Sequence, residues 1–200
     1  MPGRLFLTAS AENVAAWLGI PSCPSIAPRR NISPGQPILT FCPDRKLREM
    51  RWGMIPVGRK NARGRPVMET IINARSETVF DKSAFDGVGR ALVPCNGWYE
   101  WTGERRRKQP WRIAPRDGGL IAFAAITDTW SGPGGIEVEQ VATVTCQPNA
   151  TVRDIHHRMG VILPQHLWPD WLAGDPVALD PAPEDLLTVE KANDVDWDAA

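Results

Sequence analysis

Proline and glycine recur along the whole chain, and they constrain its fold more than any other feature. The 200 residues include nineteen prolines and seventeen glycines. Proline lacks the backbone donor that a helix interior needs, and glycine favours turns, so long helices are disfavoured over most of the sequence. This distribution predicts many short strands joined by turns, with only a few short helices.

Apolar runs indicate where these strands lie. They occupy residues 3–7, 38–41, 50–55, 91–93, 98–99, 120–126, 136–141 and 161–163. The runs at 91–93 and 98–99 suggest strands that pair with each other. The basic residues 105–108 fit the tip of a hairpin whose arms are 99–101 and 111–113.

A few short helices are expected between the strands. Ser10 is placed to cap a helix that Gly19 ends. Further helical segments are expected at residues 83–86, 149–153, 167–172 and 184–189. Repeated prolines predict an irregular loop over residues 20–37, and residues 58–66 read as a polar, basic loop. We expect a single domain over residues 1–200 with a frayed tail from about residue 192.

The composition is that of a soluble globular protein, with 42% hydrophobic residues. No apolar stretch approaches the roughly 18 residues of a membrane span, so the cytoplasm is the expected location. Four cysteines stand at wide, irregular spacings without a Cys-x-x-Cys pair: Cys23, Cys42, Cys95 and Cys146. Neither a zinc site nor a disulfide framework is indicated, and we expect reduced, mostly buried thiols.

Charge is unevenly distributed, although the formal net charge is zero. Residues 29–75 contain eleven Lys or Arg against three acidic residues, whereas residues 165–200 contain nine acidic residues against one Lys. A basic stretch of this kind is typical of a phosphate-binding face. A solvated surface that carries the two signs in separate segments is an equally good interpretation without the motifs.

Several separated blocks of sequence, taken in their order, are similar to those of one known family. They are Gly3-Arg4, residues 30–35, 52–56, 72–78, 93–94 with 97–101, 108–111 and 156–163. Together they resemble the SOS response-associated peptidase (SRAP) family from Met1 to about Leu163. The resemblance implies an α+β fold, a single domain with a bent or barrel-like mixed β-sheet flanked by short helices, and no metal or organic cofactor.

The resemblance also implies a function, because members of this family covalently capture abasic sites in single-stranded DNA. It implies single-stranded DNA as the partner of a monomer, and peptidase activity limited to removal of the initiator methionine. In the family, the residue after that methionine is a cysteine whose amine and thiol bond the sugar aldehyde. This chain has Pro2 at that position.

Aldehyde capture needs an amine, a proton shuttle, a group that activates the sugar oxygen, and cations for phosphate. The matched residues suggest Glu100 as the shuttle, Asn73 as the group that orients the amine or sugar, and His156 as the group that polarises or protonates the ring oxygen. Arg4 and Arg75 are the expected phosphate cations.

Two further residues are candidates for contacts with the bases. Trp52 near Pro34 resembles the wedge that splays bases at such sites. Each candidate residue also has a plainer interpretation. Glu100 alone is an outward strand residue, Asn73 a turn residue, His156 a buried structural histidine, and Trp52 a core side chain.

Pro2 leaves three functions open. With Met1 removed, its secondary amine can attack an aldehyde, but without a thiol it cannot close a thiazolidine ring; the product is an iminium that favours β-elimination. The second possibility is a degenerate module that binds single-stranded DNA without a covalent step. The third, from another class, is a cysteine hydrolase that uses Cys95 or Cys146 with His156.

Overall fold

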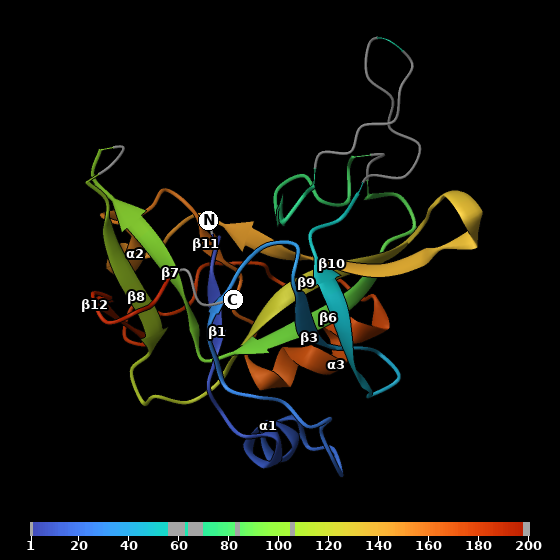
Figure 1. Cartoon of the computed structure of the whole chain (residues 1–200), viewed down its shortest axis with the longest axis horizontal. Helices are drawn as coiled ribbons and strands as arrows, with labels where there is room; N and C mark the ends of the chain where they lie inside the picture. The colour runs from blue at the N-terminus through green and yellow to red at the C-terminus, as the bar shows by residue number, and fades with distance from the viewer. Residues whose placement is uncertain (1, 56–62, 64–69, 83–84, 105–106, 198–200) are drawn as a thin grey trace.

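Two β-sheets lie side by side in the computed structural model of the chain (Figure 1). The structure describes residues 2–55, 63, 70–82, 85–104 and 107–197. One sheet closes into a barrel and the other stays open. The expected mixed, barrel-like α+β architecture is confirmed, but it consists of two sheets rather than one continuous sheet.

Five strands of the larger sheet close the barrel. They are β3 (Pro37–Phe41), β4 (Leu47–Trp52), β6 (Gly89–Cys95), β9 (Ile121–Ser131) and β10 (Glu137–Cys146). Going round the barrel, β10 pairs with β4 in parallel, and the pairs β4–β3, β3–β6, β6–β9 and β9–β10 are antiparallel. Past β4, β10 also pairs with β5 (Asn73–Arg75) and with β11 (Met159–Gly160).

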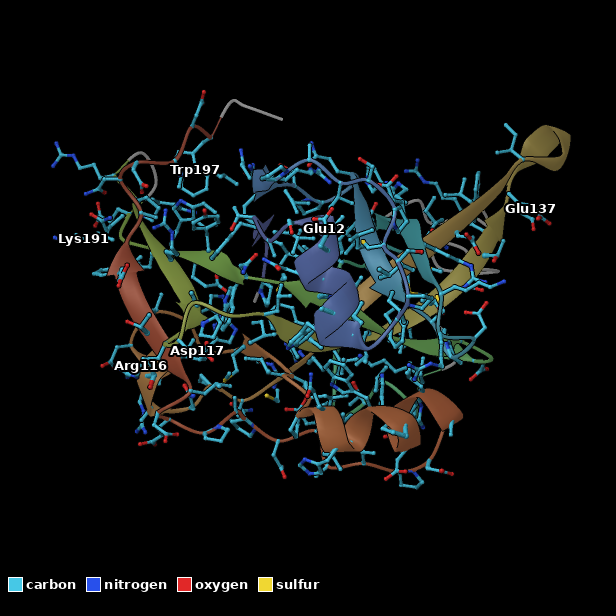
Figure 2. The ribbon with its side chains drawn as sticks, turned by 90° about the horizontal axis from the view of Figure 1, so that it is seen from below. Glu12, Arg116, Asp117, Glu137, Lys191 and Trp197 are labelled. Atoms are coloured by element: carbon cyan, nitrogen blue, oxygen red, sulfur yellow. The ribbon has the colours of Figure 1, made fainter. Side chains whose placement is uncertain are left out.

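The β9–β10 hairpin extends beyond the barrel, and its tip carries a 3₁₀ turn, η2 (Pro133–Gly135). The barrel halves of both strands are continuously buried, whereas the outer halves alternate or are exposed. This explains the alternating sequence pattern at 136–141. Figure 2 shows Glu137 at this tip, on the opposite side of the molecule from Lys191.

The open sheet has the strand order β12-β8-β7-β1-β2, and all its neighbours are antiparallel. Its strands are β1 (Leu5–Leu7), β2 (Arg29–Ile32), β7 (Gly97–Thr102), β8 (Gln109–Pro115) and β12 (Leu187–Lys191). Because β1 lies between β7 and β2, the residues just before it are held inside the sheet and not at its edge. The amino-terminal segment is thereby fixed in place.

Short helices flank the sheets, as the prolines and glycines predict. They are α1 (Ala11–Leu18), α2 (Ala150–Arg153), η3 (Gln165–Leu167) and α3 (Trp168–Ala173). The Ser10 hydroxyl accepts from the backbone N–H of Asn13, and Gly19 ends α1 in the left-handed conformation at φ 65°. The predicted cap and stop of this helix are both confirmed.

Large aromatic side chains join the two sheets. Trp98 of β7 and Phe123 of β9 are both fully buried and meet edge to face, with ring centroids 5.4 Å apart. Trp171 of α3 is also buried, and its indole N–H donates to the Ala91 carbonyl oxygen at 2.9 Å. The core therefore fills the barrel and continues into the space between the barrel and the open sheet.

Several predictions of secondary structure and of strand pairing were wrong, because the neighbouring strand in the sheet decides where a segment pairs. The runs at 91–93 and 98–99 form β6 and β7, which belong to different sheets, since the chain crosses between the sheets at Gly97. Residues 184–189 are not a helix: β12 forms there because the free edge of β8 accepts it. Near 161–163, the strand is instead β11 (Met159–Gly160), followed by a single bridge from Ile162 to Phe123.

Two further predictions differ from the structure: the irregular loop over residues 20–37 and the frayed tail from about residue 192. β2 lies within the expected irregular loop, because the prolines flank Arg29–Ile32 and do not interrupt it. The tail expected to fray from residue 192 is packed as far as Trp197: Ala192 and Val195 are buried. Residues 83–84 of one expected helix, most of the basic loop 58–66 and residues 105–106 of the hairpin tip lie outside the described residues.

No helix in the described part of the chain is both long and apolar enough to span a membrane.

Candidate functional site

The amino-terminal segment lies at the centre of the candidate site. Pro2 is buried, and its carbonyl oxygen accepts a hydrogen bond of 2.8 Å from Asn73 Nδ2. The side-chain oxygen of Asn73 accepts in turn from the hydroxyl of Thr143, which is its partner residue on β10. These two contacts fix the orientation of the amide, so that Asn73 is a donor toward Pro2. Nothing in the sequence pointed to Thr143.

Glu100 approaches the same segment from β7. Leu5 is opposite Trp98, and the backbone N–H of Tyr99 donates to the Arg4 carbonyl oxygen at 2.9 Å, so the continued register places Glu100 opposite Gly3. Its side chain is buried at 4% exposure, so the interpretation as an outward strand residue is wrong. Burial raises the pKa of the Glu100 carboxyl to about 7, because desolvation disfavours the charged form.

His156 follows α2 and is half-buried. His156 Nδ1 lies 3.0 Å from the backbone nitrogen of Arg158 and 3.1 Å from its carbonyl oxygen, so the Arg158 backbone engages this ring nitrogen. Burial lowers the pKa of His156 to about 4. A neutral ring can polarise a sugar oxygen by donating from Nε2, but it is a poor source of a proton near pH 7, so that part of the sequence prediction is not favoured.

Arg158 ties the His156 segment to the end of β5. It is buried at 4% exposure and forms a bidentate ion pair with Glu77, which lies two residues after the end of β5. Its guanidinium also donates to the Thr145 carbonyl oxygen on β10 at 2.5 Å. The hydrogen bonds from Arg158 lower the pKa of Glu77 to about 2. This pair was not predicted from the sequence, although Glu77 and Arg158 both lie within the matched motif blocks.

The two predicted phosphate cations differ in their surroundings. Arg75, the last residue of β5, is exposed. Arg4 is half-buried, and its Nη1 donates to the Asn31 side-chain oxygen at 2.7 Å. Both lie next in sequence to parts of the site already described, Arg75 close to Asn73 and Arg4 close to Pro2.

Trp52 is not a stacking platform for bases in this structure, because its side chain is fully buried. Its indole N–H donates to the Ile72 carbonyl oxygen at 3.1 Å, and its own carbonyl accepts from Gly35 at 2.7 Å. It therefore supports both the entry to β5 and the turn that carries the exposed Pro34. The core interpretation of this tryptophan is correct.

The cysteines do not form a nucleophilic site. All four are free, and Cys95 and Cys146 are buried. Burial raises the pKa of Cys95 to about 12 and that of Cys146 to about 11, so neither thiol ionises readily near neutral pH. The interpretation of the chain as a cysteine hydrolase is therefore not supported, because neither candidate thiol is a ready nucleophile. Among the described residues, no group of three His, Cys, Asp or Glu side chains could hold a metal ion.

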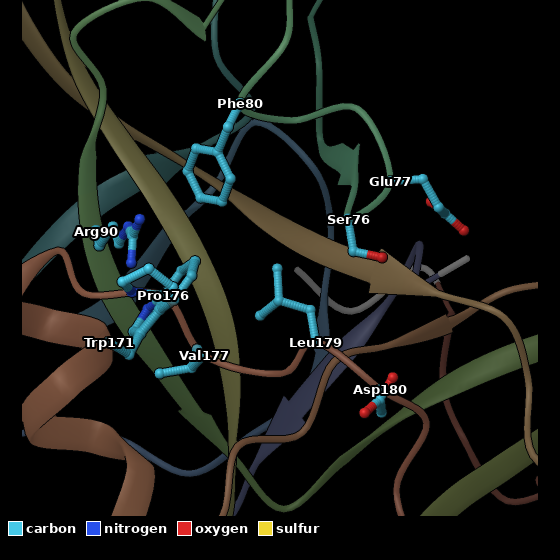
Figure 3. A pocket seen from close by; sticks show the side chains of 9 residues that line it. All are labelled: Ser76, Glu77, Phe80, Arg90, Trp171, Pro176, Val177, Leu179 and Asp180. Carbon is cyan, nitrogen blue, oxygen red and sulfur yellow. The ribbon is translucent and has the colours of Figure 1, made fainter.

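A separate hollow of roughly 550 Å³ opens beyond the end of β5 (Figure 3). Its walls include Glu77, Phe80, Trp171 and Asp180. The guanidinium carbon of Arg90 lies 4.6 Å from the ring centroids of both Phe80 and Trp171, so Arg90 contacts both rings. None of the predicted site residues lines this hollow, so it is distinct from the site around Pro2.

Comparison with known proteins places the chain in a family. The model of the SOS response associated peptidase (SRAP) family matches residues 1–199, and the chain belongs to that family. The abasic site processing protein YoqW of Bacillus subtilis is 34% identical over 161 residues, which span 77% of this chain and 70% of YoqW. The abasic site processing protein YedK of Escherichia coli is 31% identical over 181 residues, 86% of this chain and 79% of YedK.

A solved structure has the same fold. The crystal structure of a protein from Bacteroides thetaiotaomicron superposes with a TM-score of 0.81 at 23% identity, and the match covers 96% of this chain and 92% of that one. At this identity the match concerns the fold alone.

Proposed function

We propose that this chain recognises abasic sites in single-stranded DNA through its amino-terminal segment. The observation that carries the proposal is the position of Pro2, which is buried and held through its carbonyl oxygen by Asn73 at 2.8 Å. The names of its relatives, abasic site processing proteins, support the same substrate.

Phosphates of the strand bind at the cations beside this segment. Arg75 is exposed, and Arg4 keeps guanidinium donors beyond the one given to Asn31. Pro34, exposed on its turn, contacts the neighbouring bases. A single strand suits the site better than a duplex, because the ring-opened sugar must leave any base stack to reach a buried residue. The protein acts as a cytoplasmic monomer.

The chemical step begins once Met1 is removed and Pro2 carries a free secondary amine. The nitrogen attacks the sugar aldehyde carbon, and the resulting carbinolamine loses its hydroxyl as water to form an iminium. The iminium acidifies the adjacent sugar carbon. Loss of that proton to a base expels the 3′ phosphate and breaks the strand, and water then releases the amine.

The neighbouring side chains fit this sequence. Glu100, with a pKa raised to about 7 by burial, exists in both protonation states near neutral pH and can both accept and return a proton. Asn73 fixes the position of the nucleophile's own residue. Neutral His156, in the tautomer that carries its hydrogen on Nε2, donates to the sugar oxygen and stabilises the open aldehyde form.

Borohydride trapping tests the covalent step. We expect protein with Met1 removed, verified by mass spectrometry, to form a reduced adduct with an abasic single-stranded oligonucleotide and to nick it slowly without borohydride. Glu100→Gln should slow both processes by roughly 100-fold, as for loss of a general acid–base. A matched preparation that keeps Met1 has an amide at Pro2 and should bind without trapping. Tight binding by the free-amine protein without any trapped species would contradict the covalent step.

A second candidate function is a binding module without covalent chemistry, and the proline at position 2 is the observation that favours it. Pro2→Cys separates the two possibilities. If Asn73, Glu100 and His156 still frame a competent site, the correctly processed variant should form a heat-stable crosslink to abasic single-stranded DNA on a denaturing gel. If no crosslink forms, the remaining pocket is degenerate and only the binding function stands.

A further inference from the structure

The last described residues, 196–197, contact the open sheet beside the amino-terminal segment. The ring of Trp197 meets Tyr99 and Trp101 edge to face, with centroids 4.9 Å and 5.1 Å away. These two aromatic residues flank Glu100 on β7. Figure 2 shows Trp197 turned toward the sheet.

One buried side chain links this segment to the proposed phosphate cation. Asn31 on β2 is 6% exposed. Its amide nitrogen donates to the carbonyl oxygens of Asp196 and Trp197 at 3.2 Å and 3.0 Å. Its amide oxygen accepts from Arg4 Nη1 at 2.7 Å. The carboxyl-terminal backbone and the Arg4 guanidinium are therefore joined through the two ends of one amide group.

We propose that Asn31 is a positioning residue through which the carboxyl-terminal segment, residues 196–197, sets the orientation of Arg4 for a DNA phosphate. The inference rests on the proposed function. Two carbonyl acceptors on the nitrogen side leave the amide oxygen facing Arg4, since a flipped amide would oppose oxygen to oxygen. The guanidinium is thus ordered when the protein folds, and DNA binding does not have to order it.

Because the segment is acidic, the direction in which DNA affinity changes on its removal distinguishes the proposal from the alternatives. Asp196 carries a negative charge, and an acidic group near a phosphate site weakens DNA binding. Electrostatics alone therefore predicts that removing residues 196–200 strengthens DNA binding. The same increase in affinity is expected if the segment is inhibitory and must leave before DNA enters. A positioning role predicts the opposite sign.

The test is a chain that ends at Val195, which keeps the buried Ala192 and Val195 in place. Fluorescence anisotropy with an abasic single-stranded oligonucleotide should show affinity reduced roughly 3–10-fold, the effect of leaving one long side chain unordered. Trp197→Ala, which changes no charge, should give a loss in the same direction. Circular dichroism and thermal unfolding of each variant show whether it is folded.

A double-mutant cycle distinguishes positioning from a general structural effect. In an Arg4→Ala background, shortening the chain should no longer reduce affinity, because the cation that it positions is absent. Asn31→Leu, close in size, should reproduce the loss, whereas Asn193→Leu, at an exposed position whose side chain contacts Gln109, should not. Unchanged or tighter binding by the folded shortened chain, or an equal loss in the Arg4→Ala background, would overturn the proposal.

Failure of the proposed function has a different signature. In that case, the intact chain would not bind the abasic oligonucleotide, and Arg75→Ala would change nothing.

Discussion

At the scale of single residues, burial sets the charge of the two titratable groups proposed for catalysis. It raises the pKa of Glu100 to about 7 and lowers that of His156 to about 4. Both shifts favour the neutral form, because a partly dry site penalises charge on an acid and on a base alike. Near neutral pH, Glu100 can therefore exchange protons, whereas His156 is a neutral ring.

The raised pKa of Glu100 predicts a measurable pH dependence of stability. Its ordinary pKa is 4.5, so between pH 4.5 and about 7 the native state holds a proton that the unfolded state has released. Glu100 therefore contributes a free energy of unfolding that falls as pH rises through this window and levels off above it. The lowered pKa of His156 contributes a slope of the opposite sign between about pH 4 and 6.5, so the Glu100 slope is measured as the difference between the parent protein and a Glu100 variant. Glu100→Gln should remove that slope and gain about 3 kcal/mol relative to the parent protein between pH 4 and pH 8.

Urea unfolding at the two pH values measures this difference. The exposed Glu104→Gln is the matched control and should track the parent protein at both. A constant offset between Glu100→Gln and the parent protein across the range would mean that Glu100 is not buried as a neutral acid.

At the scale of elements, the crossing from β6 to β7 decides which sheet carries Glu100. Cys95 ends a barrel strand, and Gly97 begins a strand of the open sheet at φ 149°. Between them, the Asn96 side-chain oxygen accepts from the backbone N–H groups of Thr8 and Ala9 at 2.8 Å and 3.0 Å, which fixes the crossing against the end of β1. This short connection turns β7 away from β6 and alongside the amino-terminal segment.

Gly97→Ala should therefore be strongly destabilising. A Cβ at this position would lie 2.2 Å from the Ile113 carbonyl oxygen and 2.7 Å from the Phe6 ring, so the backbone of β8 would have to move. We expect a loss of about 3 kcal/mol or more in the free energy of unfolding, measured by chemical denaturation.

Gly118→Ala is the control. It also has a positive φ, of 72°, but a Cβ there would meet nothing within 4 Å, so only the backbone strain of about 1 kcal/mol remains. Equal losses for the two variants would show that the contacts with β8 are not what requires glycine at position 97.

At the scale of the whole molecule, the candidate site depends on how the barrel, the open sheet and the residues before β1 pack together. Asn73 comes from a strand attached to the barrel, Glu100 from the open sheet and Arg4 from the residues before β1. The pair of Glu77 and Arg158 links the end of β5 to the segment of His156. No two of these segments are neighbours in sequence, so their proximity depends on closure of the barrel and on its packing against the open sheet.

Local signals in the sequence predicted the balance of strands and helices, the limits of α1 and the family. The prolines and glycines indicated many short strands and few short helices, because these residues limit backbone conformation wherever they occur. Ser10 and Gly19 marked the limits of α1 correctly, because caps act within a few residues. The order of the motif blocks indicated the family, which the match over residues 1–199 establishes.

Only the tertiary structure decided which strands pair, which candidates are buried and how the tail is used. Trp52 and Glu100 both stand in apolar runs, yet one is core and the other an acid of raised pKa at the proposed site. β12 formed in place of an expected helix because β8 had a free edge, and Asn31 donates to carbonyl groups more than 160 positions away. Burial and hydrogen-bond partners are properties of distant segments brought together, which no local pattern in the sequence records.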